Sequence, residues 1–217
     1  MKTRQMKEWE GSFGNKYIKR NIYTLSQLDK DYYLTFGMTR SQMNEDFLGK
    51  LNRHMKILEV GSNIGLKLRF LADMGFKDLY GIEINEEAIN LANKLNTRLP
   101  IYIIKGSAFD IPFKDNYFGL VFTSGVLIHI NPLHIKHALR EIYRVTKKYI
   151  WGSEYYADRF KEVIYRGKKN LLWKTDYAKL YTDMFNDLIL IKEKRYSYLD
   201  NLKKINTMFL LKKTDKR

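Results

Sequence analysis

Short apolar runs alternate with amphipathic stretches over most of the chain. Five runs with little charge are typical of buried strands. They are "KILEV" (56–60), "DLYGIEI" (78–84), "IYIIKG" (101–106), "YFGLVFTSG" (117–125) and "KYIWGSEYY" (148–156). Two later runs, "LILIKEKRYSY" (188–198) and "NTMFLLKK" (206–213), predict a closing pair of strands.

The stretches between these runs have helical spacing. "IGLKLRFLADMG" (64–75) is helical in composition and ends at Gly75, a residue typical of helix C-termini. Asn85 is placed to cap the next helix, and a helix over Ser41–Leu51 precedes the first strand. A further helix over 132–145 carries the apolar stripe Ile135, Ala138, Leu139 and Ile142. Strands alternating with helices of this length predict an α/β fold, with a mostly parallel sheet covered by helices on both faces.

Composition narrows the class of protein. The chain has 217 residues, enough for one sizeable domain, and its 45% apolar content is ordinary for a globular fold. It contains no cysteine, which excludes disulfides, thiolate nucleophiles and cysteine zinc sites. The N-terminal stretch lacks the apolar core of a signal peptide, and no apolar run approaches the length that spans a bilayer. We therefore expect a soluble, cytoplasmic protein without a membrane partner.

The net charge of +15 raises the question of nucleic-acid binding. The basic residues are dispersed in pairs along the whole chain, and lysines outnumber arginines by more than two to one. Arginine is the residue suited to bidentate recognition of phosphates and bases. The pattern therefore favours a solvated basic surface over an RNA-binding one, although it leaves a nucleic-acid partner open.

The stretch "ILEVGSNIG" (57–65) is a buried strand followed by a glycine turn. A P-loop requires Gly-Lys-Ser/Thr at its end, whereas Gly65 is followed by Leu66 and Lys67. A dinucleotide fingerprint requires glycine at its first, third and sixth positions, and with Gly61 as the first, the third and sixth positions hold Asn63 and Leu66. The turn is therefore too crowded for a pyrophosphate, which disfavours a nicotinamide dehydrogenase.

Two acidic residues close neighbouring strands beside this turn. Glu59 lies near the end of the first strand, and Glu83 closes the second in "GIEIN". A carboxylate at that place can accept hydrogen bonds from both hydroxyls of a ribose. The combination predicts a nucleoside ligand without a pyrophosphate, and S-adenosylmethionine fits this description.

The layout resembles a class I S-adenosylmethionine-dependent methyltransferase over most of the chain. Two stretches are similar to the first and second motifs of that superfamily, namely "ILEVGSNIG" and "YGIEIN". Two more are similar to its adenine-side loop, "GSAFDIPF", and to its fourth strand with the following loop, "LVFTSGVLIHINP". Within the superfamily, the chain resembles the pseudaminic acid biosynthesis-associated methylases in three places. These are "FGNKYIKRN" after Trp9, "SGVLIHINP", and the region after the fifth strand. The resemblance implies a Rossmann-like, seven-stranded sheet at 51–217 in a single domain, with an N-terminal helical segment at 1–50 closing over the site.

The superfamily pattern also implies roles for individual residues. Glu59, Gly61, Asn63 and Gly65 would frame the methionine end of the cofactor, and Glu83 would bind the ribose. Ser107, where many relatives have Asp, and Ala108 would line the adenine, and Ser124 would face the amino acid of the cofactor. From the N-terminal segment, Tyr17 would place an aromatic face near the sulfonium and Arg20 would pair with a carboxylate. Asn21 would reach the substrate.

Three residues beyond the fourth and fifth strands are candidate general bases, namely His129, Glu154 and Tyr156. Arg166 in "YRG" is a candidate for binding an anionic substrate. His134 and His137 lie on a helix among basic residues, so we expect no metal site there.

These features predict methyl transfer to a small molecule. The branch resemblance implies an oxygen or nitrogen of a nonulosonic acid or of its sugar-nucleotide precursor as the acceptor. Two alternatives stay open at this point: an RNA or tRNA methyltransferase, supported by the charge, and a non-catalytic cofactor-binding protein with the same fold.

Overall fold

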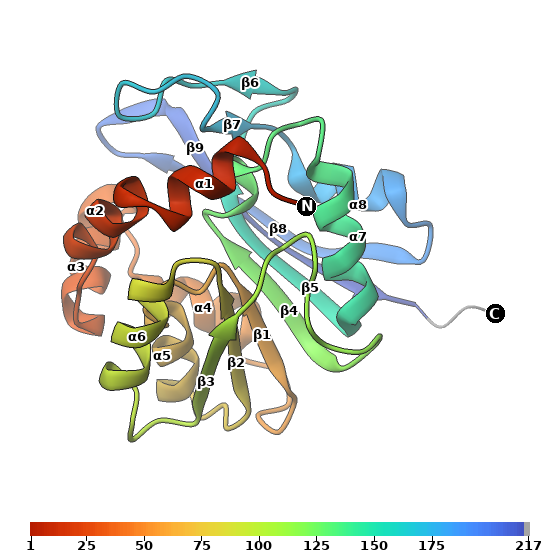
Figure 1. Ribbon diagram of the computed structural model, residues 1–217. Coiled ribbons are helices and arrows are strands. Elements are labelled where there is room, and N and C mark those ends of the chain that lie inside the picture. Colours follow the sequence, from red (N-terminus) through yellow and green to blue (C-terminus); the bar gives the residue numbers. More distant parts are fainter. Residues whose placement is uncertain (215–217) are drawn as a thin grey trace. The chain divides into compact units, whose positions relative to one another are not determined.

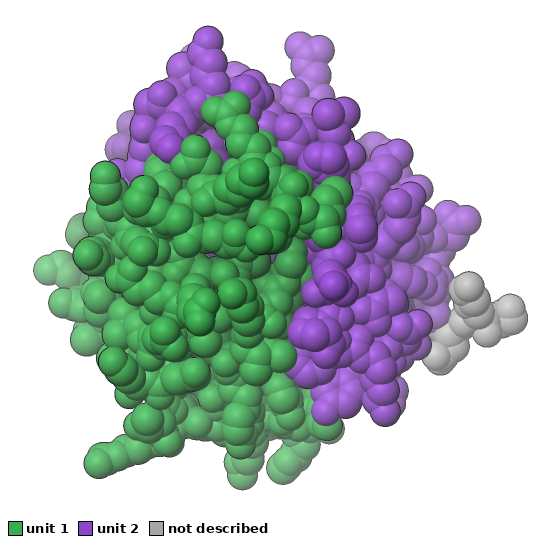
Figure 2. All heavy atoms as spheres, viewed as in Figure 1, with its two compact units in different colours: residues 1–107 green, residues 108–217 purple. Residues whose placement is uncertain are grey.

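The computed structural model describes residues 1–214. The chain forms two compact units, Met1–Ser107 and Ala108–Arg217, which Figure 2 shows in different colours. The sequence distinguishes residues 1–50 from 51–217 instead, and that distinction stays a prediction.

The first unit begins with four helices, shown in red to orange in Figure 1. They are α1 (Arg4–Glu10), α2 (Ser12–Arg20), α3 (Leu25–Phe36) and α4 (Arg40–Leu48). Threonines start three of them, because a threonine oxygen accepts a backbone N–H of the first turn. Thr24 and Thr39 form complete capping boxes with Gln27 and Gln42. The helix predicted over Ser41–Leu51 is α4.

Three parallel strands follow in the first unit, in the order β3-β2-β1. They are β1 (Ile57–Val60), β2 (Leu79–Glu83) and β3 (Ile101–Lys105), connected by α5 (Leu66–Asp73) and α6 (Glu86–Leu95). Asn85 caps α6 as predicted, since its side chain accepts the Ala88 N–H at 3.1 Å. Gly75 has a φ of +88° just after α5, which agrees with its predicted role.

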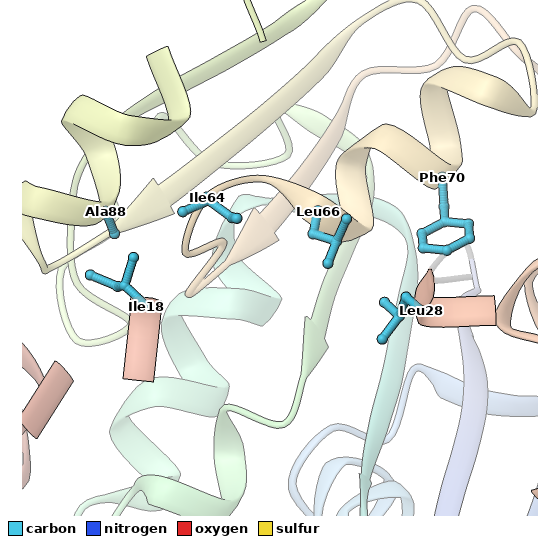
Figure 3. Close-up of a cluster of buried hydrophobic side chains, with 6 residues drawn as sticks. All are labelled: Ile18, Leu28, Ile64, Leu66, Phe70 and Ala88. Atoms are coloured by element: carbon cyan, nitrogen blue, oxygen red, sulfur yellow. The ribbon is translucent and has the colours of Figure 1, made fainter. Parts of the chain in front are cut away.

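The N-terminal helices share an apolar core with the glycine turn. Ile18 of α2 and Leu28 of α3 are buried with Ile64 and Leu66 of the turn, and with Phe70 and Ala88 of α5 and α6. Figure 3 shows Ile18 beside Ala88 and Leu28 beside Phe70. Burial of apolar surface is the main stabilising term in such a contact, so the N-terminal helices are part of the first unit.

The second unit continues with β4 (Phe118–Ser124), the 3-10 helix η1 (Leu127–His129), α7 (Ile135–Val145) and β5 (Thr146–Tyr155). Its sheet has the order β4-β5-β9-β8 and closes with the antiparallel pair β8 (Leu188–Tyr198) and β9 (Asn201–Lys213). The predicted stripe of α7 is confirmed, because Ile135, Ala138, Leu139 and Ile142 are all buried.

The predicted fold class is confirmed. The strands make up a mostly parallel seven-stranded sheet with helices between them. The sequence missed a segment between β5 and β8. It contains a short hairpin, β6 (Lys161–Glu162) and β7 (Trp173–Lys174), and the helix α8 (Tyr177–Met184). In the part of the chain described, no helix has the length and apolar character needed to cross a membrane.

Candidate active site

The turn after β1 has a left-handed backbone at three positions. Gly61, Asn63 and Gly65 have φ values of +73°, +49° and +78°. The Gly61 N–H donates to Ile82 O of β2 at 2.8 Å, which ties the turn to the next strand. At Gly65 the φ of +78° strains any other residue, and an added Cβ would also lie 2.8 Å from Ile103 Cδ1, which would have to shift. The backbone shape thus explains both glycines.

Glu83 stands at the end of β2, beside this turn. Its Oε2 accepts the Asn63 N–H at 2.8 Å, and its Oε1 accepts the N–H groups of Ile84 and Asn85 at 2.8 and 2.9 Å. Burial raises the pKa of Glu83, and these three bonds act against that rise. A carboxylate has about four acceptor positions. One position therefore remains on Oε2, which suits one ribose hydroxyl rather than the predicted two.

Glu59 lies deeper than the sequence suggests, with 2% of its surface exposed. It accepts a backbone hydrogen bond from Leu68 in the first turn of α5, while its Oε2 has no hydrogen-bond partner among the described residues. Burial raises its pKa to about 8, although Lys67 and Arg40 lower it. This placement favours a capping role for Glu59 at α5 over contact with the methionine of the cofactor.

The N-terminal helices are fixed beside Glu83 by Asn85. The Asn85 amide donates to Trp9 O at 2.9 Å and to Asn15 Oδ1 at 2.8 Å. At the other end of α1, Ser107 Oγ lies 4.0 Å from Met6 Sδ. This part of the first unit thus brings the N-terminal segment next to the carboxylate predicted to bind ribose. The sequence identified Asn85 only as a helix cap and gave no sign of its contact with α1 and α2.

The three predicted residues of α2 and its end differ in exposure. Tyr17 is half-buried, and its ring contacts the Trp9 ring edge to face at 5.2 Å. Arg20 is exposed, and Asn21 donates from its side chain to Tyr17 O at 2.7 Å. Tyr17 is therefore held within the aromatic group of α1 and α2, and the ligand roles of all three residues stay predictions.

In the second unit, the loop after β4 is organised by Glu154. Gly125, next to Ser124, has a φ of +68° and starts the turn into η1. The Glu154 carboxylate accepts the N–H groups of Val126, Leu127 and Ile128 at 3.2, 3.3 and 3.5 Å, and also a hydrogen bond from Thr123. With 1% of its surface exposed, Glu154 is better suited to holding this loop than to the predicted role of general base.

Glu154 makes the stability of the protein depend on pH. Burial raises its pKa from 4.5 to about 7. Between these two values the folded state binds more protons than the unfolded state, so stability is lost as pH rises. We expect the free energy of unfolding of the wild type, relative to Glu154→Gln, to fall by about 3 kcal/mol between pH 4.5 and 8. Urea denaturation at several pH values measures this, and equal slopes in the two proteins would contradict it.

His129 ends η1 and contacts the segment that follows β5. Its Nδ1 lies 2.6 Å from Leu171 O, and its ring lies 5.2 Å from the Tyr165 ring. A carbonyl oxygen only accepts, so Nδ1 carries the proton and the lone pair of the ring is on Nε2. Burial lowers the pKa of His129 to about 4, and the ring is therefore neutral at physiological pH. The neutral ring carries a lone pair on Nε2 that can accept a proton, but a pKa of about 4 makes it a weak base, and the role of general base stays a prediction for His129.

The surroundings of Tyr156 do not favour its predicted role as a general base, and those of Arg166 and Ala108 leave their predicted roles untested. Tyr156 donates to Asp158 Oδ1 at 2.7 Å, and its pKa is raised to about 12 chiefly by that bond. It is thus protonated and poorly suited to be a base. Arg166 is exposed, with a φ of +50°, and its guanidinium lies 5.9 Å from the Tyr165 ring. Ala108 is half-buried at the start of the unit.

His134, just before α7, and His137 within it have a packing role. The rings of His134 and His137 contact the Phe109 ring edge to face at 6.4 and 5.8 Å. Within residues 1–214, no group of three or more His, Asp or Glu side chains is arranged to hold a metal ion.

Comparisons with known proteins agree with this geometry. Residues 58–149 match the family described as methyltransferase domain. Phosphoethanolamine N-methyltransferase of Plasmodium falciparum is 22% identical over 178 residues, which are 77% of this chain and 67% of that protein.

Two solved structures show the likeness of fold. The PH0226 protein from Pyrococcus horikoshii OT3 superposes with a TM-score of 0.63 at 16% identity, covering 94% of this chain and 92% of that one. The 1,6-didemethyltoxoflavin-N1-methyltransferase of Burkholderia thailandensis has a TM-score of 0.61 at 13% identity, covering 81% and 76%. That structure contains its substrate and S-adenosylhomocysteine.

Proposed function

We propose that this S-adenosylmethionine-dependent methyltransferase methylates an oxygen or nitrogen of an anionic small molecule, a sugar acid or sugar nucleotide of nonulosonic acid biosynthesis. The enzyme class and the cofactor predicted from the sequence are supported by the match of residues 58–149 to the methyltransferase domain and by the relative from Plasmodium falciparum. The residues of the first unit fit this cofactor, because Glu83 keeps one acceptor position for a hydroxyl beside the glycine turn.

The observation that carries the proposal is the setting of His129. Its Nδ1 is fixed by Leu171 O, and the segment that holds it, residues 158–174, has six basic and two acidic side chains. A neutral imidazole can take a proton from the methyl acceptor, and the basic segment next to it can attract a negative charge on another part of the same acceptor molecule. The resemblance of "SGVLIHINP" and of the region after β5 to the pseudaminic acid-associated methylases supports a sugar acceptor.

Methyl transfer from S-adenosylmethionine requires few catalytic groups from the protein. S-adenosylmethionine, when bound, supplies a methyl group already activated on a sulfonium. The protein must orient the acceptor in line with that group and keep water away. His129 Nε2 is the atom we assign to accept the proton from the acceptor hydroxyl or amine. Glu154 positions η1, on which His129 stands, through the three backbone N–H groups it accepts.

A relative supports the size of the acceptor. The Plasmodium falciparum protein is by its name an N-methyltransferase of phosphoethanolamine, a small charged molecule. The net charge of +15 is the observation that would favour RNA instead. The test must therefore separate these two acceptor classes.

Transfer of radioactive methyl groups provides this test. The purified full-length protein is incubated with labelled S-adenosylmethionine and, separately, with sugar acids, with sugar nucleotides and with total RNA. We expect label in a sugar fraction that binds to an anion-exchange column, and none with Glu83→Ala at the same cofactor concentration. Label found only in the RNA would show that the proposal is wrong.

A further inference from the structure

We infer that Lys161, Lys174 and Lys204, near the carboxyl end of β5, bind a phosphoryl group of the methyl acceptor. The acceptor would then be a phosphate ester or diphosphate, such as a sugar nucleotide, and not a free sugar acid. This inference rests on the proposed function and makes its substrate class more specific. None of the three lysines is among the site residues predicted from the sequence.

Two of the lysines come from the hairpin β6–β7, and the third comes from β9, later in the chain. Lys161 of β6 is the direct cross-strand partner of Lys174 of β7. Lys174 Nζ lies 5.3 Å from the centre of the Tyr155 ring, at the end of β5. Lys204 Nζ of β9 lies 5.7 Å from the Tyr198 ring, and the Tyr155 and Tyr198 rings meet edge to face at 6.4 Å. Each of two contacting aromatic rings thus has a lysine ammonium near its centre. We call these three lysines and two tyrosines the lysine cluster.

Like charges oppose one another in the lysine cluster. Like charges directly opposite each other destabilise a strand pair. Lys161 and Lys174 nevertheless face each other across β6 and β7. The pKa of Lys174 is lowered by burial and then by Lys161 and Lys204, both of which carry its own charge. Lys204 has Asp200 at 3.9 Å, but both side chains are more than half exposed, so the pair contributes little. An anion bound between the lysines would remove this repulsion.

A phosphoryl group matches the lysine cluster better than a carboxylate does. The lysine ammonium is a compact point charge that binds a phosphate without the bidentate geometry of an arginine, and several lysines together match the higher charge of a phosphoryl group. A phosphate monoester or diphosphate carries more negative charge than a carboxylate and has oxygens for more than two donors. The rings of Tyr155 and Tyr198 offer apolar faces for a sugar or a base attached to the phosphate.

Two lysines of the cluster, Lys161 and Lys174, lie in the same segment as Leu171, the residue that contacts the candidate base. Leu171, whose carbonyl oxygen contacts His129, is three residues before Lys174. Three residues of fully extended chain span at most about 11 Å. The backbone of Lys174 therefore lies within about 11 Å of that of Leu171, a span comparable to the length of a sugar nucleotide. The hairpin β6–β7 follows β5, a strand whose carboxyl end faces the ligand side in folds of this type.

Binding of simple phosphates tests the inference without methyl transfer. The probes are inorganic pyrophosphate and uridine diphosphate, with acetate as the carboxylate control, titrated calorimetrically into the full-length protein at low salt. We expect Lys174→Gln to weaken pyrophosphate binding about tenfold, and Lys161→Gln with Lys204→Gln to weaken it at least as much. Lys136→Gln, an exposed lysine of α7, removes the same charge and should leave the affinity unchanged. Thermal unfolding verifies that each variant is folded.

The possible outcomes separate this inference from the proposed function. Equal losses in Lys136→Gln and Lys174→Gln, or acetate binding as tight as that of pyrophosphate, would overturn the phosphoryl site. If an RNA oligonucleotide binds far more tightly than the diphosphates and loses that affinity in Lys174→Gln, the lysine cluster serves a nucleic acid and the small-molecule reading is overturned. If pyrophosphate binding depends on the lysines but no sugar is methylated, the phosphoryl site is supported and the proposed function is refuted.

Discussion

Glu83→Ala is expected to weaken S-adenosylmethionine binding about 100-fold. The substitution removes a charged acceptor for a ribose hydroxyl, a hydrogen bond that contributes about 1.5–3 kcal/mol. It also removes the acceptor of the Asn63 N–H, which fixes the left-handed residue in the middle of the glycine turn. Both losses lower the affinity for the cofactor. The first removes a direct contact, and the second alters the shape of the glycine turn. Calorimetric titration with S-adenosylhomocysteine measures the effect.

Two variants separate the role of Glu83 from a general loss of charge. Glu83→Gln keeps an acceptor oxygen and the side-chain length, so its affinity should lie between those of the wild type and Glu83→Ala. Glu87→Ala removes an exposed carboxylate of the first turn of α6 and should bind the cofactor like the wild type. Cofactor affinity in Glu83→Ala within twofold of the wild type, in a folded protein, would remove Glu83 from the site.

His129→Ala is expected to lower kcat by 100-fold or more, because general base catalysis contributes about 10²–10⁴-fold. The affinity for S-adenosylhomocysteine should change little. The pKa of His129 is lowered to about 4 by burial, so the ring is already neutral at pH 6. We therefore expect the kcat of the wild type to show no titration of this histidine between pH 6 and 8. Initial rates of methyl transfer at saturating acceptor measure both effects.

His137→Ala is the matched control for His129. His137 is exposed on α7, where its ring packs against Phe109. Its loss should leave kcat within a factor of two. If the two variants lose activity to the same extent, or if His129→Ala loses only cofactor affinity, the role of His129 as base is wrong.

The sequence predicted the elements of the fold because local forces decide them. The run "KILEV" and the glycine turn need no distant partner to be recognised, since a parallel strand covered on both faces is apolar throughout. Asn85 caps α6 through an atom only three residues away. The hairpin β6–β7 escaped prediction because each of its strands has two residues, too short to show a pattern.

The roles of the carboxylates could not be predicted in the same way. Glu59, Glu83 and Glu154 all stand at or near strand ends, and in sequence they look alike. Glu59 and Glu154 are almost fully buried and accept backbone N–H groups of α5 and η1, whereas Glu83 keeps a free acceptor position beside the glycine turn. Which of them meets a ligand depends on what packs over each strand end, and these neighbours come from other parts of the chain.

By itself the sequence determined the alternation of strands and helices, the glycine turn and the kind of cofactor, because periodicity and turn chemistry act over a few residues. The tertiary structure alone decided which acids are buried, which nitrogen of His129 carries the proton, and that Lys161, Lys174 and Lys204 lie together. These properties depend on the low polarity inside the fold and on charges brought close from distant strands. Both arise only when the chain is folded.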